Sequence, residues 1–302
     1  MTHQHDSRPP ICDYEGSNYR TEFWEGRGRD YEDRVERIAL ERLLPHGGRR
    51  LLEVGAGFGR LTNEYDSFGQ VVLLDYSLSQ LQYAQENLGR SARYVYVAAD
   101  AYHLPFHPGV FDAVTMVRVL HHMANVEAVL TQIRRVLVQN GVFILEHANK
   151  RNIKSIVRHA LKKQSWDPND LAPVEFVELN FDFHPEHIRR ELQRSGFTIQ
   201  TRLPVSLFRL DQLKDTVPLD VLTKLDGLFQ QSGLLVTPSI FVRSVAVGST
   251  PNNLGRDMLF ACPECGGELE RRGDTITCLR DGLRWSVRDG IYDFKAPLES
   301  DD

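Results

Sequence analysis

The stretch from Arg50 to Leu61, R-L-L-E-V-G-A-G-F-G-R-L, places the strongest constraint on how this chain can fold. Its first half is a short apolar run of the kind that a buried parallel strand carries. Three glycines follow on alternate positions, Gly55, Gly57 and Gly59. Because glycine has no Cβ, a charged small molecule can lie directly against backbone N–H groups at such a turn. Taken alone, the pattern fits a cofactor-binding turn, including those of nicotinamide and flavin enzymes, and also a turn that merely packs closely.

Acidic residues stand at the ends of three predicted strands. The apolar run 71–74 ends in Asp75, about 20 residues after the first glycine, where a carboxylate would accept hydrogen bonds from ribose hydroxyls. The run 93–98 leads to Asp100, which could take the exocyclic amino group of adenine. Glu53 lies inside the end of the first strand and suits a ligand with a positive amino group. Ligands of parallel sheets bind beyond the carboxyl ends of the strands, so we expect these acids in one site.

Four motifs in this order resemble the class I S-adenosylmethionine-dependent methyltransferases: L-L-E-V-G-A-G-F-G, L-L-D-Y-S, A-A-D-A-Y-H-L-P-F and F-D-A-V-T-M-V-R-V-L-H-H. The glycines read GxGxG and not the GxGxxG of dinucleotide enzymes. The resemblance covers residues 31–247, closely in the first half and loosely in the second. It implies an α/β, Rossmann-like sheet of seven strands in the order 3-2-1-4-5-7-6, with S-adenosylmethionine as cofactor. The cofactor residues that it implies are Glu53, Gly55, Ala56, Gly57, Gly59, Asp75, Tyr76, Asp100, Ala101, Val117 and Arg118.

Aromatic and charged residues interleave between Asn18 and Arg34, ahead of a helix predicted to run to Leu43. In the resembling family a segment at this place often folds over the cofactor, so Tyr31 or Trp24 could cover the sulfonium. The alternative is that these aromatics pack the first helix on the sheet, and the sequence favours neither. Residues 1–16 are polar and contain proline, and we expect them to be disordered.

Arg118, His121 and His122 lie just past the fourth predicted strand, where a substrate would meet the methyl group. If the acceptor is a hydroxyl, an amine or an acidic carbon, a histidine with a pKa of about 6.5 could remove its proton. In the resembling family a His-His pair here often opens the next helix for structural reasons. Catalysis by His121 or His122 and a structural role both stay open.

Residues 150–163 form a predicted amphipathic helix with lysines and arginines around one apolar stripe. The stripe consists of Ile153, Ile156, Val157, Ala160 and Leu161. Its basic face could cover an anionic substrate or RNA, or it could be an ordinary solvated face. Residues 164–183 are predicted to be an irregular insertion, at the place where methyltransferases of this class vary to choose substrates.

A second, very small domain is predicted at residues 258–297, after a linker at residues 248–257 that ends the methyltransferase-like part, residues 17–247. So short a segment cannot bury enough apolar surface alone. Its motifs resemble a zinc ribbon, with a CxxC knuckle and a second, incomplete knuckle. The metal ligands would be Cys262, Cys265, Cys278 and Asp281. Bound zinc is one alternative, and a degenerate ribbon held by packing is the other.

The pieces C-P-x-C, C-L-x-D and R-D-G-I of this domain resemble the small zinc-ribbon-like proteins that activate tRNA, ribosomal and protein methyltransferases. The resemblance implies a module that stabilises the catalytic domain or presents a macromolecular substrate. The fourth-strand motif lacks the N/D-P-P-Y/F pattern of many amino-directed nucleic-acid enzymes, which favours a small-molecule acceptor. The expected function is therefore methyl transfer to a small molecule. RNA or protein methylation, and a non-catalytic S-adenosylmethionine-binding regulatory module, are the alternatives.

Composition sets outer limits to these interpretations. With 41% apolar residues the chain can build a sizeable core. A net charge of −5 argues against a surface generally adapted to nucleic acid, although a local basic patch stays compatible with it. The longest apolar run is too short to cross a bilayer, and the N-terminus carries no apolar secretory segment. We therefore expect a cytoplasmic protein with no membrane partner.

Overall fold

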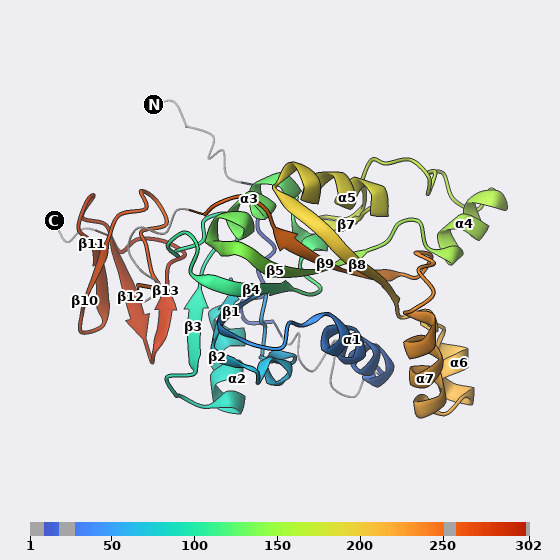
Figure 1. The fold of residues 1–302 in the computed structure, drawn as a ribbon, viewed down its shortest axis with the longest axis horizontal. Helices are drawn as coiled ribbons and strands as arrows, with labels where there is room; N and C mark the ends of the chain where they lie inside the picture. The colour runs from blue at the N-terminus through green and yellow to red at the C-terminus, as the bar shows by residue number, and fades with distance from the viewer. Residues whose placement is uncertain (1–8, 18–27, 251–257, 300–302) are drawn as a thin grey trace.

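The computed structural model describes residues 9–17, 28–250 and 258–299. Seven strands form the centre of the protein in the order β3-β2-β1-β4-β5-β9-β8, which confirms the predicted order 3-2-1-4-5-7-6 (Figure 1). The first five run parallel, and β9 runs antiparallel to both β5 and β8. The bounds are β1 Gly48–Val54, β2 Phe68–Asp75, β3 Tyr94–Ala98, β4 Phe111–Met116, β5 Leu137–Ala148, β8 Phe197–Val205 and β9 Ser239–Ala246.

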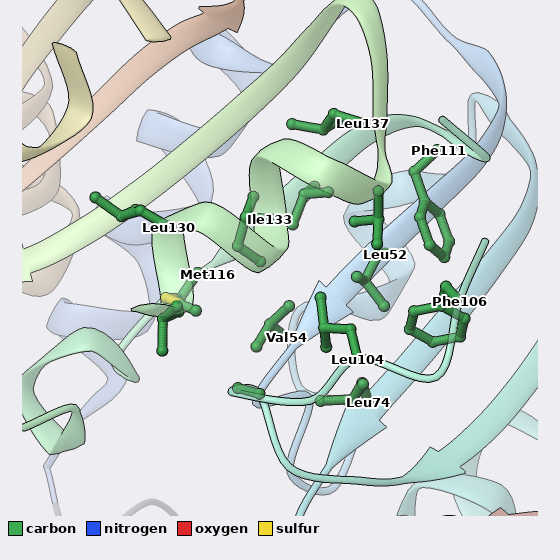
Figure 2. Close-up of a cluster of buried hydrophobic side chains, with 14 of the residues drawn as sticks. Leu52, Val54, Leu74, Leu104, Phe106, Phe111, Met116, Leu130, Ile133 and Leu137 are labelled. Atoms are coloured by element: carbon green, nitrogen blue, oxygen red, sulfur yellow. The ribbon is translucent and has the colours of Figure 1, made fainter. Parts of the chain in front are cut away.

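Helices cover both faces of this sheet because successive strand residues point to opposite faces. Leu52 and Leu74 pack with α3 on one face, in the cluster that Figure 2 shows, while Leu51 and Leu73 pack with α1 and α2 on the other. Both faces of β1 are therefore buried, as its apolar sequence predicts. The helices are α1 Asp30–Leu43, α2 Leu78–Leu88, α3 Val126–Val136, α4 Ile153–Ala160, α5 Pro185–Arg194, α6 Asp211–Thr216 and α7 Leu219–Phe229.

Two short turns and one hairpin complete the methyltransferase-like part. The segment between β1 and β2 contains a single 3₁₀ turn, Thr62–Tyr65, because β2 already begins at Phe68 and leaves room for only one turn. Another 3₁₀ turn, Leu120–His122, follows β4. The insertion expected to be irregular contains the hairpin β6 (Val174–Val177) and β7 (Asn180–Asp182). Within the described residues, no helix is both long enough and apolar enough to cross a bilayer.

The C-terminal strands, which the sequence predicts as a separate domain, lie beside the edge strand β3. They continue the sheet past β3, which brings it to 11 strands (Figure 1). The added strands are β10 Leu269–Arg272, β11 Thr275–Cys278, β12 Arg284–Arg288 and β13 Ile291–Asp293.

The joint between the two parts is β13, which runs parallel to β3 and pairs Ile291 with Tyr96 and Asp293 with Ala98. An edge strand presents unpaired backbone N–H and C=O groups, and pairing with β13 satisfies those of β3. Trp285 is 1% exposed and belongs to the same apolar cluster as the sheet residue Val97. The module thus buries its apolar residues against the larger core.

Candidate active site

The main cavity opens at the carboxyl ends of β1, β2 and β3 and contains about 780 Å³ of space. A side cavity adjoins it and shares Val54, Gly55, Gly57 and Arg118 with it. Most of the predicted cofactor residues meet here. The main cavity is lined by Gly55, Gly57, Asp75, Tyr76, Asp100, Ala101 and Arg118, and the side cavity adds Glu53, Ala56 and Val117.

Asp75 lies at the floor of the main cavity and is held by backbone donors. Its Oδ2 accepts a hydrogen bond from the Gly57 N–H at 2.8 Å, and its Oδ1 accepts one from the Ser77 N–H at 2.9 Å. Burial raises the pKa of Asp75, against the lowering effect of these N–H groups. Gln80 also lines the cavity, and its Oε1 is buried without a hydrogen-bond partner among the described residues. The sequence analysis missed this acceptor, although it lies five residues after Asp75.

The three glycines of the loop have different surroundings. All three have positive φ, at +70°, +52° and +79°. A Cβ on Gly55 would overlap Val119, whereas one on Gly57 would meet open space beside the cavity. Gly59 packs on Leu88 of α2 and lines neither cavity. The assignment of Gly59 to the cofactor stays a prediction, and its observed close contact is with a helix.

Glu53 is a buried carboxyl group at the side cavity. Its Oε2 accepts a hydrogen bond from the Thr62 hydroxyl at 2.6 Å, and its Oε1 accepts a longer one from the Tyr65 hydroxyl at 3.4 Å. Burial raises its pKa to about 7, against the lowering effects of Thr62, Arg60 and Tyr65. At neutral pH this group therefore exchanges readily between its charged and neutral forms, and a cation in the side cavity would favour the charged one.

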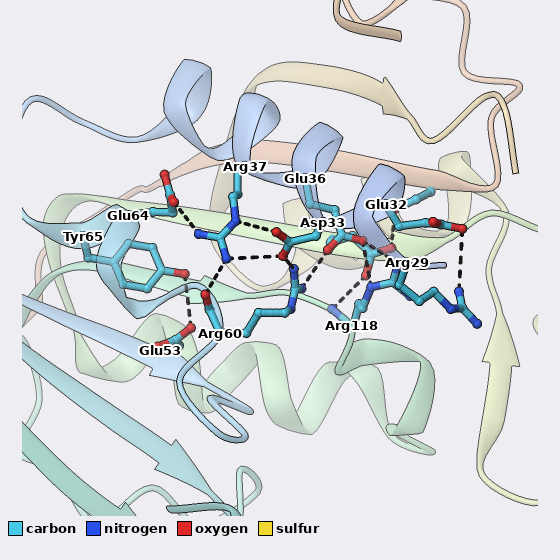
Figure 3. A network of polar contacts seen from close by, with 12 residues as sticks. Arg29, Glu32, Asp33, Glu36, Arg37, Glu53, Arg60, Glu64, Tyr65 and Arg118 are labelled. Atoms are coloured by element: carbon cyan, nitrogen blue, oxygen red, sulfur yellow. Dashed lines mark hydrogen bonds and ion pairs between the residues drawn. The ribbon is translucent and has the colours of Figure 1, made fainter. Parts of the chain in front are cut away.

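A network of charges joins α1 to the two cavities (Figure 3). Glu36, whose side chain is 0% exposed, accepts hydrogen bonds from Arg60 at 2.7 Å and from the Arg118 Nε at 2.7 Å. Burial alone would raise the pKa of Glu36, but these two guanidinium groups outweigh it and hold the pKa below its ordinary value. Arg118 has a φ of +59°, and its N–H donates to Glu146 at 2.9 Å. Helix α1 thus fixes two arginines that line the side cavity.

The role of the acids on α1 was not predicted from the sequence. The sequence does contain a pattern that could have predicted this role. Glu32 and Glu36 fall at helical spacing, next to the apolar residues of the same predicted helix. A carboxylate on a buried helix face needs a partner, so two acids there predict buried cations. Arg60 and Arg118 are the cations that Glu36 binds.

Tyr31 lies outside both cavities and does not cover the cofactor site. It is 1% exposed, its hydroxyl donates to Asp226 of α7 at 2.6 Å, and the same hydroxyl accepts a hydrogen bond from the Phe208 N–H at 3.0 Å. Burial and the neighbouring carboxylate raise the pKa of Tyr31. The prediction that it covers the sulfonium is wrong, and the packing alternative describes it. Trp24 lies outside the described residues.

Residues 9–17 lie over the main cavity, where the sequence analysis expected a disordered tail. Ile11, Cys12 and Tyr14 line the cavity. Glu15 accepts a hydrogen bond from the Leu78 N–H at 2.7 Å, at the start of α2. A carboxylate is favourable at a helix N-terminus, where backbone N–H groups lack partners, and this anchors the segment. The expectation of disorder is thus wrong for residues 9–16, while residues 1–8 lie outside the described residues.

His122 borders the main cavity in a fixed orientation. Its Nδ1 lies 2.9 Å from the carbonyl oxygen of Leu179, and its Nε2 lies 3.0 Å from the Tyr14 hydroxyl. A carbonyl can only accept, so Nδ1 carries the proton and Nε2 accepts from Tyr14. Burial lowers the pKa of His122, which favours this neutral form. His121, whose pKa burial lowers even further, lines neither cavity, so its position gives no support to a catalytic role.

A third hollow, here called the Met123 groove, adjoins the main cavity and shares Met123 with it. It contains about 580 Å³ of space between the start of α3, the insertion and α5. Its lining includes Phe181 and Phe183 together with Pro173, and it also carries four polar side chains, Asn125, Glu127, His187 and Glu191. The groove can therefore take a molecule with an apolar body beside the site where the cofactor is predicted.

The four predicted metal ligands of the C-terminal module come together. The ligand atoms of Cys262, Cys265, Cys278 and Asp281 all lie within 4.8 Å of one another. The Cys265 and Cys278 sulfur atoms are 3.5 Å apart, and the Cys262 sulfur is 3.4 Å from the Asp281 carboxylate. Four ligands this close can surround one ion with Zn–S bonds of ~2.3 Å. The donor set therefore fits zinc.

Comparison with known proteins gives consistent matches. Residues 52–145 match the family described as "Methyltransferase domain". The chain is 34% identical over 179 residues to the ubiquinone/menaquinone biosynthesis C-methyltransferase of Pseudomonas savastanoi pv. phaseolicola, covering 54% of this chain and 70% of that protein. It is 29% identical over 155 residues to the malonyl-[acyl-carrier protein] O-methyltransferase of Geobacter sulfurreducens, covering 49% of this chain and only 55% of that protein.

A solved complex between the Haloferax volcanii Trm112 methyltransferase activator and a methyltransferase has a similar fold. The TM-score is 0.52 at 16% identity, and the match covers 74% of this chain and 95% of that chain. At this identity the likeness concerns the fold alone.

Proposed function

This chain belongs to the class I S-adenosylmethionine-dependent methyltransferases, and from that premise we propose that it methylates a small organic acceptor with an apolar body. The observation that carries the proposal is the Met123 groove, which adjoins the main cavity and is lined by Phe181 and Phe183. The names of the two relatives support it, since one refers to C-methylation in ubiquinone and menaquinone biosynthesis and the other to O-methylation of malonyl-[acyl-carrier protein].

The residues of the two cavities fit S-adenosylmethionine, which when bound supplies a methyl group already activated on a sulfonium. Asp75 and the unpartnered Gln80 Oε1 offer acceptors to the ribose hydroxyls, and Asp100 offers one to the adenine amino group. Glu53 can bind the amino group of the methionine part, and Arg118 can bind its carboxylate. The amino group and the carboxylate of the methionine part thus each have an opposite charge in the lining.

His122 is the residue that we assign to proton removal. Methyl transfer to a carbon or oxygen acceptor releases a proton, and a neutral imidazole with a free lone pair can accept it. The Leu179 carbonyl holds the Nδ1 proton in place, which leaves Nε2 as the basic atom. Nε2 accepts a hydrogen bond from the Tyr14 hydroxyl, so the proton of the acceptor could reach His122 directly or through Tyr14. No comparable contact supports His121.

The test is transfer of labelled methyl into an extract of the source organism, separated into solvent-soluble small molecules, water-soluble small molecules, protein and RNA. Label in the solvent-soluble fraction is the expected result. The Asp75→Ala protein is the control and should give at least about tenfold less label at a subsaturating concentration of cofactor. Label in RNA or protein would contradict a small-molecule acceptor and assign substrate presentation to the C-terminal module. Cofactor binding without transfer to any fraction would support the regulatory alternative.

We also propose that the C-terminal module binds one zinc ion through Cys262, Cys265, Cys278 and Asp281. Metal analysis of the purified protein should find about one zinc per chain, and Cys278→Ser should lose most of it. Cys12→Ser is the matched control, because Cys12 lies at the main cavity and far along the chain from the cluster. Equal metal content in the wild type and the Cys278→Ser protein would contradict the proposal.

A further inference from the structure

Helix α4 exposes its apolar side to solvent. Ile153, Val157 and Leu161 follow one another at the spacing of a helix face and are 53%, 50% and 59% exposed. The buried residue of the helix is a polar one, Ser155. This is the reverse of the arrangement in an ordinary surface helix, whose apolar stripe faces the core.

A row of basic side chains runs beside this apolar row. Lys154, Arg158 and Lys162 each come one residue after a member of the apolar row, and all three are exposed. Among the described residues, none of the three forms an ion pair. The chain as a whole carries a net charge of −5, so this row is a local concentration of positive charge on an acidic protein.

The helix is held firmly at its start, so the exposed rows have a defined orientation. The Ile153 N–H donates to the carbonyl of Val236 at 2.8 Å, and the Asn152 side chain caps the helix by accepting from the Ser155 N–H at 3.0 Å. At the other end, the His159 ring lies 3.1 Å from the carbonyl of Trp166. In Figure 1, α4 projects from the edge of the molecule away from the sheet.

We propose that α4 docks on a membrane surface that contains anionic lipids. The helix would lie in the plane of the interface, with Ile153, Val157 and Leu161 in the boundary between headgroups and acyl chains. Lys154, Arg158 and Lys162 would meet the lipid phosphates, since long basic side chains reach the headgroup level from beside an apolar stripe. The apolar row matches the acyl-chain layer of such a surface, and the basic row matches its phosphate layer. The proposal rests on this match.

Other anionic partners match the surface less well. A nucleic-acid backbone would pair with the basic row but would leave the apolar row in water, since phosphate contacts are polar. The expectation of no membrane partner rested on the absence of a spanning segment, and this proposal differs from it. A short helix lying on the surface needs no such segment.

The position of α4 also relates to the active site, in a step that rests on the proposed function. The insertion that follows α4 carries Leu179, which binds His122, and Phe181, which lines the Met123 groove. Docking would bring this insertion close to the lipid, where an apolar acceptor would be concentrated. Failure of vesicle binding would leave the activity proposal standing, because methyl transfer is measured separately.

The test is flotation of the full chain with vesicles of phosphatidylcholine, with or without phosphatidylglycerol. We expect binding to the anionic vesicles, at least about tenfold tighter than to phosphatidylcholine alone and weakened by salt. Replacing Ile153, Val157 and Leu161 together with Gln should weaken it at least about tenfold, and so should replacing Lys154, Arg158 and Lys162 together with Gln. Circular dichroism of each variant checks that the fold is kept.

The matched control lies on α7, where Val221, Leu225 and Leu228 are 44%, 46% and 69% exposed at similar spacing. Their neighbours Asp220 and Lys224 form no basic row, so the triple change of these residues to Gln should leave binding unchanged. Equal loss in the α4 and α7 apolar variants would overturn the proposal. Binding that survives loss of the α4 apolar row, or that ignores lipid charge, would overturn it as well.

Discussion

Glu53→Gln is the change that tests the side cavity most directly. Burial raises the pKa of Glu53 from 4.5 to about 7, so the folded protein binds this proton more tightly than the unfolded chain does. The stability that the proton contributes is complete below pH 4.5 and is lost as the pH rises through about 7. A shift of ~2.5 pH units corresponds to about 3 kcal/mol. Because Gln stays neutral, the variant should be more stable than the wild type by up to this amount at pH 8 and about equal at pH 4.5.

Cofactor affinity should change in the opposite direction. If only ionised Glu53 binds the amino group of S-adenosylmethionine, affinity in the wild type should fall about tenfold between pH 8 and pH 6. The variant should bind more weakly at pH 8 and show little change between these two values. Asp75, whose pKa is also raised, affects both proteins alike.

Calorimetric titration at pH 8 and pH 6, in two buffers with different heats of ionisation, measures both affinity and proton release. The wild type should release close to one proton on binding at pH 6, and the variant should release much less. Chemical denaturation at pH 8 measures the gain in stability. The same pH dependence in both proteins would refute the placement of the amino group at Glu53, and a loss of stability at pH 8 would refute the raised pKa.

Three further predictions concern other parts of the chain. Asp75→Ala should weaken cofactor binding at least about tenfold, or about 1.4 kcal/mol, because the ribose loses a charged acceptor, and unchanged affinity in a calorimetric titration would contradict this. Tyr31→Phe should cost about 1–3 kcal/mol in denaturant unfolding, since the Asp226 carboxylate and the Phe208 N–H lose a partner, with cofactor affinity unchanged. Trp285→Ala should cost about 3–5 kcal/mol and speed hydrogen exchange in β3, and β3 amides that exchange at the wild-type rate would show that the module does not protect that strand.

The sequence was sufficient to predict the central sheet and most of the cavity lining. Apolar runs that end in glycine or an acid mark the carboxyl ends of β1, β2 and β3, and topology then brings Glu53, Asp75 and Asp100 together. These predictions succeeded because each depends on a strand and on residues in or close to its carboxyl end. The strand order followed from the family resemblance and not from the pattern alone.

The features that the sequence did not predict depend on contacts between distant segments. Nothing local shows that Glu15 will cap α2 or that Tyr31 will bind Asp226, 195 residues away. Hydrophobic periodicity predicted the helix at Ile153–Ala160 but could not show which side it buries, since its apolar stripe suits a core or a membrane equally well. The structure decides this because Ser155 is buried and Val157 is 50% exposed.

The pairing of β13 with β3 also determines how the protein responds to dilution. A separate subunit bound at that edge would dissociate when the protein concentration fell below its dissociation constant. Here residues 248–257 join the module covalently to the domain, and a connection of this length holds two surfaces at an effective concentration on the order of millimolar. The β3 edge should therefore stay covered at any expression level, with one module for each catalytic domain.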